Sequence, residues 1–195
     1  YFSNTRIFIL MDIPQNIEAS SNARRRVTIL GSTGSIGLST INIIKKNKKD
    51  FNVILLSAKQ NYKKLINQAK SVNAKNVLIK DKNLFEKVKK GLIKRSTKVF
   101  AGEIPINKIV NSKVDYTIAG IVGIAGLQPT LDAIKVSKAI AVANKESIIC
   151  GWDLINKQIK KYSTRIYPLD SEHFSIMELT KKITNEENKE IIITA

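Results

Sequence analysis

A glycine-rich turn that directly follows an apolar run is the feature that most constrains the fold of this 195-residue chain. The run is VTIL at 27–30, the turn reads GSTGSIG at 31–37, and apolar residues recur at helical spacing after it. Glycines suit such a turn because its backbone takes unusual angles and approaches an anion with no Cβ atoms in the way, while the next helix offers unpaired N–H groups to a phosphate. The pattern therefore predicts a strand, a turn and a helix that hold the pyrophosphate of a dinucleotide. Because the glycines are spaced G-x-x-G-x-x-G rather than G-x-G-x-x-G, an ordinary glycine-rich loop between a strand and a helix remains the alternative.

The residues after the second expected strand favour NADP over NAD. This strand, FNVILL at 51–56, runs into Ser57, Ala58, Lys59 and Gln60. Sites specific for NAD usually place Asp or Glu here to accept a hydrogen bond from the ribose 2′-hydroxyl. No carboxylate is present at this point to repel a 2′-phosphate, and Lys59 can pair with one. The alternative is that Lys59 is a solvated surface lysine of a lysine-rich chain.

Helical and β-type patterns alternate along the rest of the chain. Helices are expected at 62–72, near 84–92 and at 127–136, and further strands at 76–79, 98–100, 115–119 and 139–142. Such alternation predicts a parallel sheet with helices on both faces. We therefore expect an α/β fold, a Rossmann-type doubly wound parallel sheet that binds its ligands at the carboxyl ends of the strands.

The strong positive charge of the chain does not by itself indicate a nucleic-acid partner. Lys and Arg number 33 against 16 Asp and Glu, which gives a net charge of +17. The lysines are scattered among asparagines and isoleucines rather than grouped on one helix with aromatic residues, so we expect no nucleic-acid partner. A positive field would instead attract NADP and a phosphorylated substrate, because both are anions.

The single cysteine and the length of the apolar stretches limit the class of protein. The lone cysteine, Cys150, excludes an internal disulfide, and its apolar, helical sequence context predicts a buried, inert thiol. No apolar stretch is long enough for a transmembrane helix, so the sequence predicts no membrane partner.

A lysine and a carboxylate follow the strand expected at 139–142. The motif NKES at 144–147 places Lys145 and Glu146 at the lip of the sheet, where the nicotinamide end of a cofactor would lie. The alternative is that Asn144 only caps the next helix, with Glu146 in its first turn.

A second polar motif, DSEH at 170–173, follows an expected strand at 165–169. Two carboxylates one residue apart at a strand end can face one cation, and oxygen ligands suit Mg²⁺ or Mn²⁺. A capped helix start with an acidic first turn would give the same pattern. His173 is the only histidine, and we expect it to orient neighbouring groups or to begin a helix rather than to act as a general base.

Together, the motifs GSTGSIG, ANKES and PxDSEH, in this order and at these intervals, resemble the 1-deoxy-D-xylulose 5-phosphate reductoisomerase family. The resemblance runs from about Arg26 to Ala195 and includes the segment 121–130. It implies an enzyme that uses NADPH and a divalent metal, Mg²⁺ or Mn²⁺. The implied reaction isomerises and reduces 1-deoxy-D-xylulose 5-phosphate to 2-C-methyl-D-erythritol 4-phosphate in non-mevalonate isoprenoid synthesis.

The resemblance also implies a role for each matching residue. The residues expected to bind the cofactor are Thr33, Gly34, Ser35 and Ile36 at the pyrophosphate, Ala58, Lys59 and Gln60 near the ribose phosphate, and Asn144 and Glu146. The residues expected to be catalytic are Lys145, Asp170 and Glu172; Asp170 and Glu172 ligate the metal, and Lys145, Ser171 and Glu172 contact the substrate. The family often has Gly and Asn where this chain has Ala58 and Gln60.

Family members are longer than this chain, so the resemblance implies an amino-terminal portion that is inactive by itself. The expected division is an extension at 1–24, an NADPH-binding domain at 25–164 and the truncated start of an α+β catalytic domain at 165–195. The resemblance further implies a phosphorylated sugar substrate, a homodimer in the full-length form, and a location in the bacterial cytoplasm in preference to a plastid-type organelle.

Two other classes of protein remain open. A different NADP-dependent Rossmann oxidoreductase, similar to semialdehyde dehydrogenases, would share the glycine turn but needs a catalytic cysteine in a polar loop, unlike Cys150. A basic nucleic-acid-binding module would explain the charge but not the glycine turn.

Overall fold

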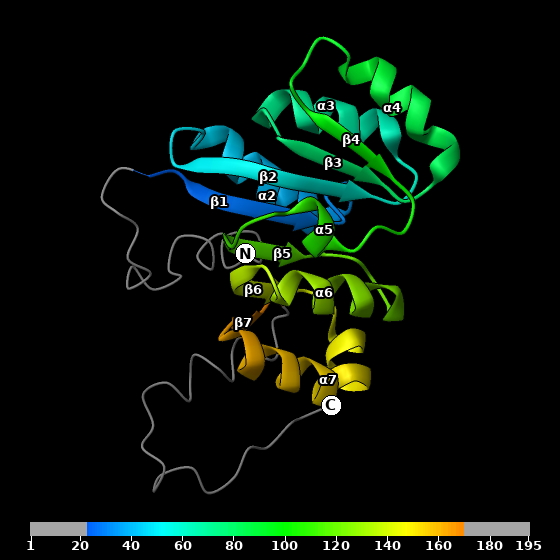
Figure 1. The fold of residues 1–195 in the computed structure, drawn as a ribbon. Coiled ribbons are helices and arrows are strands. Elements are labelled where there is room, and N and C mark those ends of the chain that lie inside the picture. The colour runs from blue at the N-terminus through cyan, green and yellow to red at the C-terminus, as the bar shows by residue number, and fades with distance from the viewer. Residues whose placement is uncertain (1–22, 170–195) are drawn as a thin grey trace, which may run out of the picture.

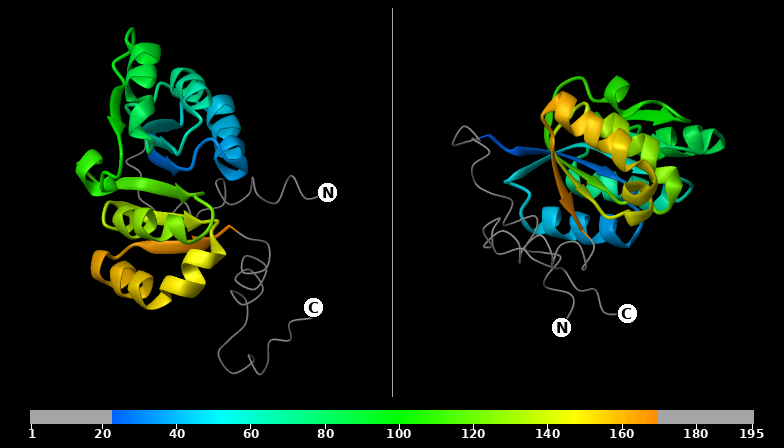
Figure 2. Two further views of the ribbon diagram at one scale, coloured as in Figure 1. Left: turned by 90° about the vertical axis from the view of Figure 1, so that its right-hand side faces the viewer. Right: turned by 90° about the horizontal axis from the view of Figure 1, so that it is seen from below.

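The computed structural model describes residues 23–169, which form a seven-stranded parallel sheet with helices on both faces (Figures 1 and 2). The strand order is β4-β3-β2-β1-β5-β6-β7. The strands are β1 (Arg25–Leu30), β2 (Phe51–Ala58), β3 (Asn76–Ile79), β4 (Lys98–Ala101), β5 (Val114–Ala119), β6 (Ser137–Val142) and β7 (Arg165–Pro168). The α-helices are α2 (Ser35–Lys46), α3 (Tyr62–Val72), α4 (Phe85–Leu92), α5 (Ile106–Ile109), α6 (Leu127–Ile134) and α7 (Lys145–Tyr162), and 3₁₀ turns η1 (Lys82–Leu84) and η2 (Ile124–Gly126) precede α4 and α6.

Each face of the sheet carries its own hydrophobic core. Helices α2, α3 and α4 cover one face, where Ile41, Leu65 and Val88 pack against the sheet. Helices α5, α6 and α7 cover the other face, through residues such as Ile134 and Ile155. Since both faces are covered, the central strands read as apolar runs in the sequence. The expected doubly wound α/β fold is confirmed.

The sheet extends one strand beyond the expected domain boundary at residue 164. Strand β7 pairs in parallel with β6, with Ile166 opposite Ile140 and Tyr167 opposite Ala141. Within residues 23–169 it is an edge strand, and Pro168 suits this position because it has no N–H to donate to a further strand. The sequence assigned this strand to a following domain because it leads into the DSEH motif.

Most expected elements form within a few residues of their predicted bounds. The helix at Tyr62–Val72 and the strand at Asn76–Ile79 match their expected ranges, whereas the short helix α5 was not predicted. No helix within residues 23–169 has the length and apolarity needed to cross a membrane.

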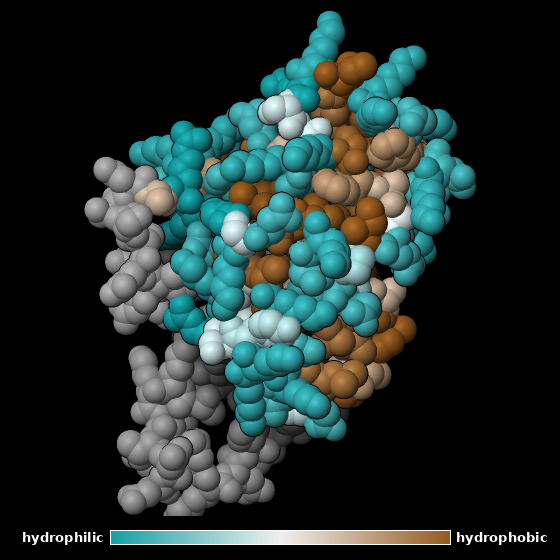
Figure 3. Space-filling view, viewed as in Figure 1, coloured by the Kyte–Doolittle hydropathy of each residue, from teal (hydrophilic) through white to brown (hydrophobic). Residues whose placement is uncertain are grey.

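The expectation of a buried thiol at Cys150 is wrong, because this side chain is exposed. The fully buried residues of α7 are Ser147, Gly151 and Ile155, and the partly buried Ile148 also packs against the core, so the rest of its first half faces outward. Its apolar residues Ile149 and Trp152 are 71% and 45% exposed. Figure 3 shows this apolar surface over α7 in the lower part of the view.

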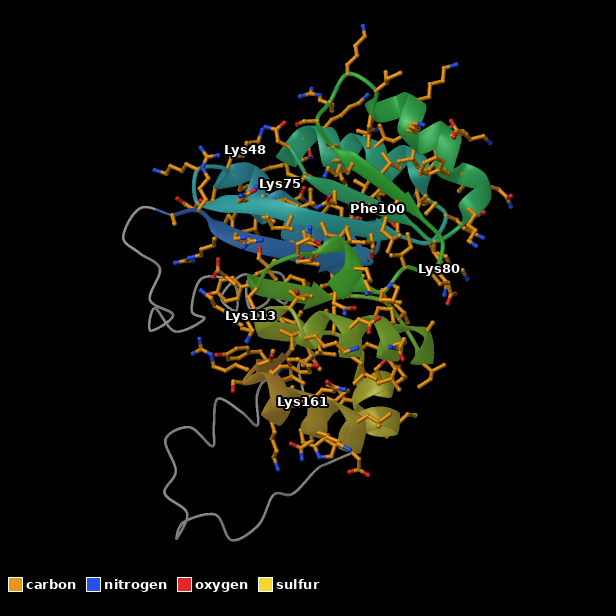
Figure 4. All side chains as sticks on the ribbon, in the orientation of Figure 1. Lys48, Lys75, Lys80, Phe100, Lys113 and Lys161 are labelled. Atoms are coloured by element: carbon orange, nitrogen blue, oxygen red, sulfur yellow. The ribbon has the colours of Figure 1, made fainter. Side chains whose placement is uncertain are left out.

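The exposed lysines are spread over the fold. Those labelled in Figure 4 lie on separate elements: Lys48 after α2, Lys75 and Lys80 on either side of β3, Lys113 before β5 and Lys161 in α7. The charge is therefore as scattered in space at these positions as it is in the sequence.

Two glycines of the turn between β1 and α2 are required by the fold itself. Gly31 has φ +73°, and a Cβ there would lie 2.7 Å from the carbonyl oxygen of Gly120. A Cβ on Gly37 would lie 2.4 Å from the backbone of Ser32. Gly34 differs, because its φ of −78° is open to any residue and a Cβ would come no closer than 3.4 Å to another atom.

We expect Gly37→Ala to lower the free energy of unfolding by at least about 2 kcal/mol, because backbone atoms that cannot swing aside must move. Gly34→Ala is the matched control and should stay within about 1 kcal/mol of the wild type. Urea denaturation followed by far-UV circular dichroism measures both. Equal stability of the two variants would contradict the packing described for Gly37.

Candidate functional site

The carboxyl ends of β2, β1, β5, β6 and β7 form a continuous edge. The strand order reverses between β1 and β5, which is where open parallel sheets bind their ligands. Backbone hydrogen bonds continue past the strands and fix the turns against each other. They are Ser32 N–H to Ser57 O (2.8 Å), Gly120 N–H to Leu30 O (2.9 Å), Ala143 N–H to Ala119 O (3.0 Å) and Leu169 N–H to Val142 O (2.9 Å).

The glycine turn presents the start of α2 at this edge. Gly34 is the N-cap and has no side chain that could bond to the first N–H groups of the helix. Gly34 and Ser35 are exposed, Thr33 and Ile36 are half-buried, and the first turn of α2 contains no acidic residue. Free N–H groups at the positive end of a helix form an anion site. The structure therefore brings together the four residues that were expected at a pyrophosphate.

A buried polar pair that the sequence analysis missed holds this turn to α3. The Ser32 hydroxyl donates to Gln68 Oε1 (2.8 Å), and Gln68 Nε2 donates to Ser32 O (2.7 Å). Both side chains are at least 96% buried. The sequence did contain a signal for this contact, because Gln68 lies on the apolar face of the expected helix. A glutamine that is buried there needs a hydrogen-bond partner.

A second missed contact comes from the first turn of α3. Lys64 Nζ donates to the carbonyl oxygen of Thr33 at 3.3 Å, although the two residues are 31 positions apart. Nothing in the local sequence indicates this contact, because it depends on how α3 lies beside the turn.

The expected ribose end lies at the carboxyl end of β2. Ala58 is buried, whereas Lys59 and Gln60 are exposed. The nearest acidic residue along the edge is Asp81, whose N–H donates to Lys59 O at 3.1 Å. Its carboxylate accepts the N–H of Asn83 at 3.0 Å as the cap of η1. The fold therefore places Asp81 beside the end of β2, with its carboxylate engaged as the cap of η1.

Asn144 is a cap of α7, as the alternative interpretation of the NKES motif predicted. Its Oδ1 accepts the N–H of Ser147 at 3.0 Å. Its Nδ2 donates to the carbonyl oxygens of Ile121, at 2.6 Å, and of Gly123. With 3% exposure, the side chain ties the loop after β5 to the start of α7. Lys145 and Glu146, by contrast, are exposed at the same edge.

The residues expected to hold a metal, Asp170 and Glu172, lie outside the described residues, as does Ser171. Leu169, which directly precedes them in the chain, is bonded to the carboxyl end of β6. Within 23–169 no group of three or more His, Cys, Asp and Glu side chains could hold a metal ion.

The comparison with known proteins agrees with the order of motifs along this edge. The model of the 1-deoxy-D-xylulose 5-phosphate reductoisomerase family matches residues 27–151, which include the glycine turn and the NKES motif. The chain belongs to the 1-deoxy-D-xylulose 5-phosphate reductoisomerase family. The 1-deoxy-D-xylulose 5-phosphate reductoisomerase of Pelagibacter ubique is 50% identical over 173 residues, which are 88% of this chain and 45% of that protein. The chain therefore spans a little under half the length of the curated reductoisomerase relatives it matches.

Solved structures of reductoisomerases share the fold. The Zymomonas mobilis reductoisomerase in complex with NADPH superposes with a TM-score of 0.73 at 40% identity, over 77% of this chain and 40% of that one. A reductoisomerase in complex with NADPH, fosmidomycin and magnesium gives a TM-score of 0.70 at 32% identity, over 76% of this chain and 37% of that one.

We expect Asn144→Asp to lower the free energy of unfolding by about 2–3 kcal/mol, because a carboxylate would face two carbonyl oxygens that now accept hydrogen bonds. Glu146→Gln, an exposed change in the same helical turn, should cost less than about 1 kcal/mol. Urea titration at neutral pH compares the two variants. If Asn144→Asp proved as stable as the control, the buried hydrogen bonds of Asn144 would not hold the loop.

Proposed function

We propose that this chain forms the NADPH-binding part of a 1-deoxy-D-xylulose 5-phosphate reductoisomerase. The protein that contains it would isomerise and reduce 1-deoxy-D-xylulose 5-phosphate to 2-C-methyl-D-erythritol 4-phosphate. Membership of the family supports the activity, and the observation that carries the proposal is Gly34. It is exposed at the carboxyl edge of the sheet, and the packing of the chain itself does not require a glycine there.

The turn fits a dinucleotide pyrophosphate. Without a Cβ at Gly34, a phosphate can approach the first N–H groups of α2, those of Ser35 and Ile36, with Thr33 beside them. Lys59 then lies after β2, where a ribose 2′-phosphate needs a cation, with Ala58 and Gln60 on either side. NADPH, when bound, supplies a hydride.

At the nicotinamide end of the cofactor, we propose that residues at the start of α7 contact the cofactor and the substrate. Asn144 fixes the loop after β5 and presents the two residues that follow it. The exposed Glu146 faces the cofactor, and the ammonium of Lys145 stabilises negative charge that develops on a substrate oxygen.

For the metal we propose Asp170 and Glu172 as ligands of Mg²⁺ or Mn²⁺, with Ser171 and Glu172 also touching the substrate. This part of the proposal depends on the sequence pattern, since carboxylate oxygens suit both ions.

The remaining assignments are also proposals. We place the NADPH-binding domain from residue 25 through β7, with the catalytic domain beginning after it and residues 1–24 as an extension. A homodimer and a cytoplasmic rather than a plastid location are proposed on the family resemblance alone.

Binding of the two nucleotides tests the proposed cofactor. We expect NADPH to bind at least tenfold more tightly than NADH, about 1.4 kcal/mol, because Lys59 pairs with the 2′-phosphate and residues 57–60 contain no carboxylate to bond the 2′-hydroxyl of NADH. Lys59→Met should remove most of this preference by weakening NADPH alone. Isothermal titration of both nucleotides into both proteins measures it.

Gly34→Ala is the control for that experiment. It should weaken NADPH and NADH alike, because the pyrophosphate is common to both. Equal affinities of the wild type for the two nucleotides would refute the role of Lys59. Failure of the wild type to bind either one would refute the proposed function.

The metal ligands are tested in a protein that contains this chain and is active. Asp170→Asn or Glu172→Gln should abolish turnover of 1-deoxy-D-xylulose 5-phosphate and leave NADPH affinity nearly unchanged, because the two sites follow different strands. The loss of NADPH absorbance measures turnover, and titration measures affinity. Near-normal turnover by either variant would mean that the DSEH motif begins a helix and holds no metal.

A further inference from the structure

Lys64 crosses from α3 to the glycine turn that follows β1. Its ammonium lies 3.3 Å from the carbonyl oxygen of Thr33, the residue before Gly34. The side chain is half-buried, whereas that of its neighbour Lys63 is exposed. One carbonyl uses one of the three N–H donors of the ammonium, so two remain for another partner at this site.

The segment around Lys64 carries several positive charges and no carboxylate. Lys64 lies in the first turn of α3, at the positive end of the helix dipole, and that turn contains no acidic residue. Lys59 and Lys63 add like charge within a few residues, and no Asp or Glu occurs between Phe51 and Lys80. In the described part of the chain Lys64 forms no salt bridge. A bound anion would relieve this accumulation of positive charge.

We propose that Lys64 is a cofactor-binding residue whose ammonium contacts a phosphate of the nicotinamide dinucleotide. This inference rests on the proposed function. It assigns the turn a cation of its own, supplied by α3, in addition to Lys59 after β2. The carbonyl of Thr33 holds the ammonium beside the start of α2, so that both reach the same anion.

The test compares two adjacent lysines in the 195-residue chain. Lys64→Met removes the charge and keeps the length of the side chain, and Lys64→Arg keeps the charge. Lys63→Met is the matched control, because it removes an equal charge from the same helical turn without a contact to the glycine turn. Isothermal titration gives the affinity of each protein for NADPH and NADH, and thermal unfolding without nucleotide reports on the fold.

We expect Lys64→Met to weaken NADPH binding about tenfold, Lys64→Arg to restore most of the loss, and Lys63→Met to change it less than about twofold. The melting temperature of the nucleotide-free chain should stay near that of the wild type in all three variants. An equal loss for NADPH and NADH would identify the pyrophosphate as the group contacted, and a loss confined to NADPH would identify the 2′-phosphate. Either result supports a phosphate contact.

Three results would overturn the inference while leaving the proposed function intact. They are an unchanged affinity of Lys64→Met for both nucleotides, an equal loss in Lys63→Met, and a loss in Lys64→Met that appears only with a lowered melting temperature and is not restored by arginine. A wild-type chain that bound neither nucleotide would overturn the proposed function, and this inference with it.

Discussion

The structure depends on how closely the turn after β1 approaches the backbone around it. Gly31 lies against the carbonyl of Gly120, at the point where the strand order reverses, and Gly37 brings the first turn of α2 onto Ser32. These distances leave no room for a methyl group, so they fix where β1, β5 and α2 meet. The direction of α2 and its free N–H groups follow from that contact. The position of the exposed start of α2 at the edge of the sheet is thus a result of backbone packing rather than of side-chain shape.

Much of the fold could be predicted because the spacing of apolar residues along the sequence indicates each helix and strand locally. Helix α3 was predicted within its observed bounds, since its buried residues recur at helical spacing. The misses have a common physical cause, which is that they depend on neighbours distant in the sequence. Strand β7 is short, and only its pairing with β6 assigns it to this sheet. Cys150 has apolar neighbours in the sequence, but it lies on the outer face of α7, which no other element covers among residues 23–169.

In the candidate site, too, the features set by local sequence could be predicted and the long-range contacts could not. The turn at its glycines and the helix start at the NKES motif were predictable, because each depends on a short stretch of sequence. The contacts that hold them in place were not, because Gln68 and Lys64 reach the turn from more than thirty positions away. Asn144 caps α7, and this role is compatible with the proposed one of the NKES motif. A residue can cap a helix and, by doing so, set the position of the lysine that follows it.

The position of Trp152 gives the molecule an optical reporter. It is the only tryptophan in the chain, and it lies on α7 seven residues after Lys145, with 45% of its surface exposed. The emission of an indole overlaps the absorption of a reduced nicotinamide, so excitation can pass from one to the other over short distances. Fluorescence excited at the red edge of the protein spectrum therefore originates from a single helix beside the NKES motif. Its quenching would register how near a nicotinamide ring lies to α7, with no added label.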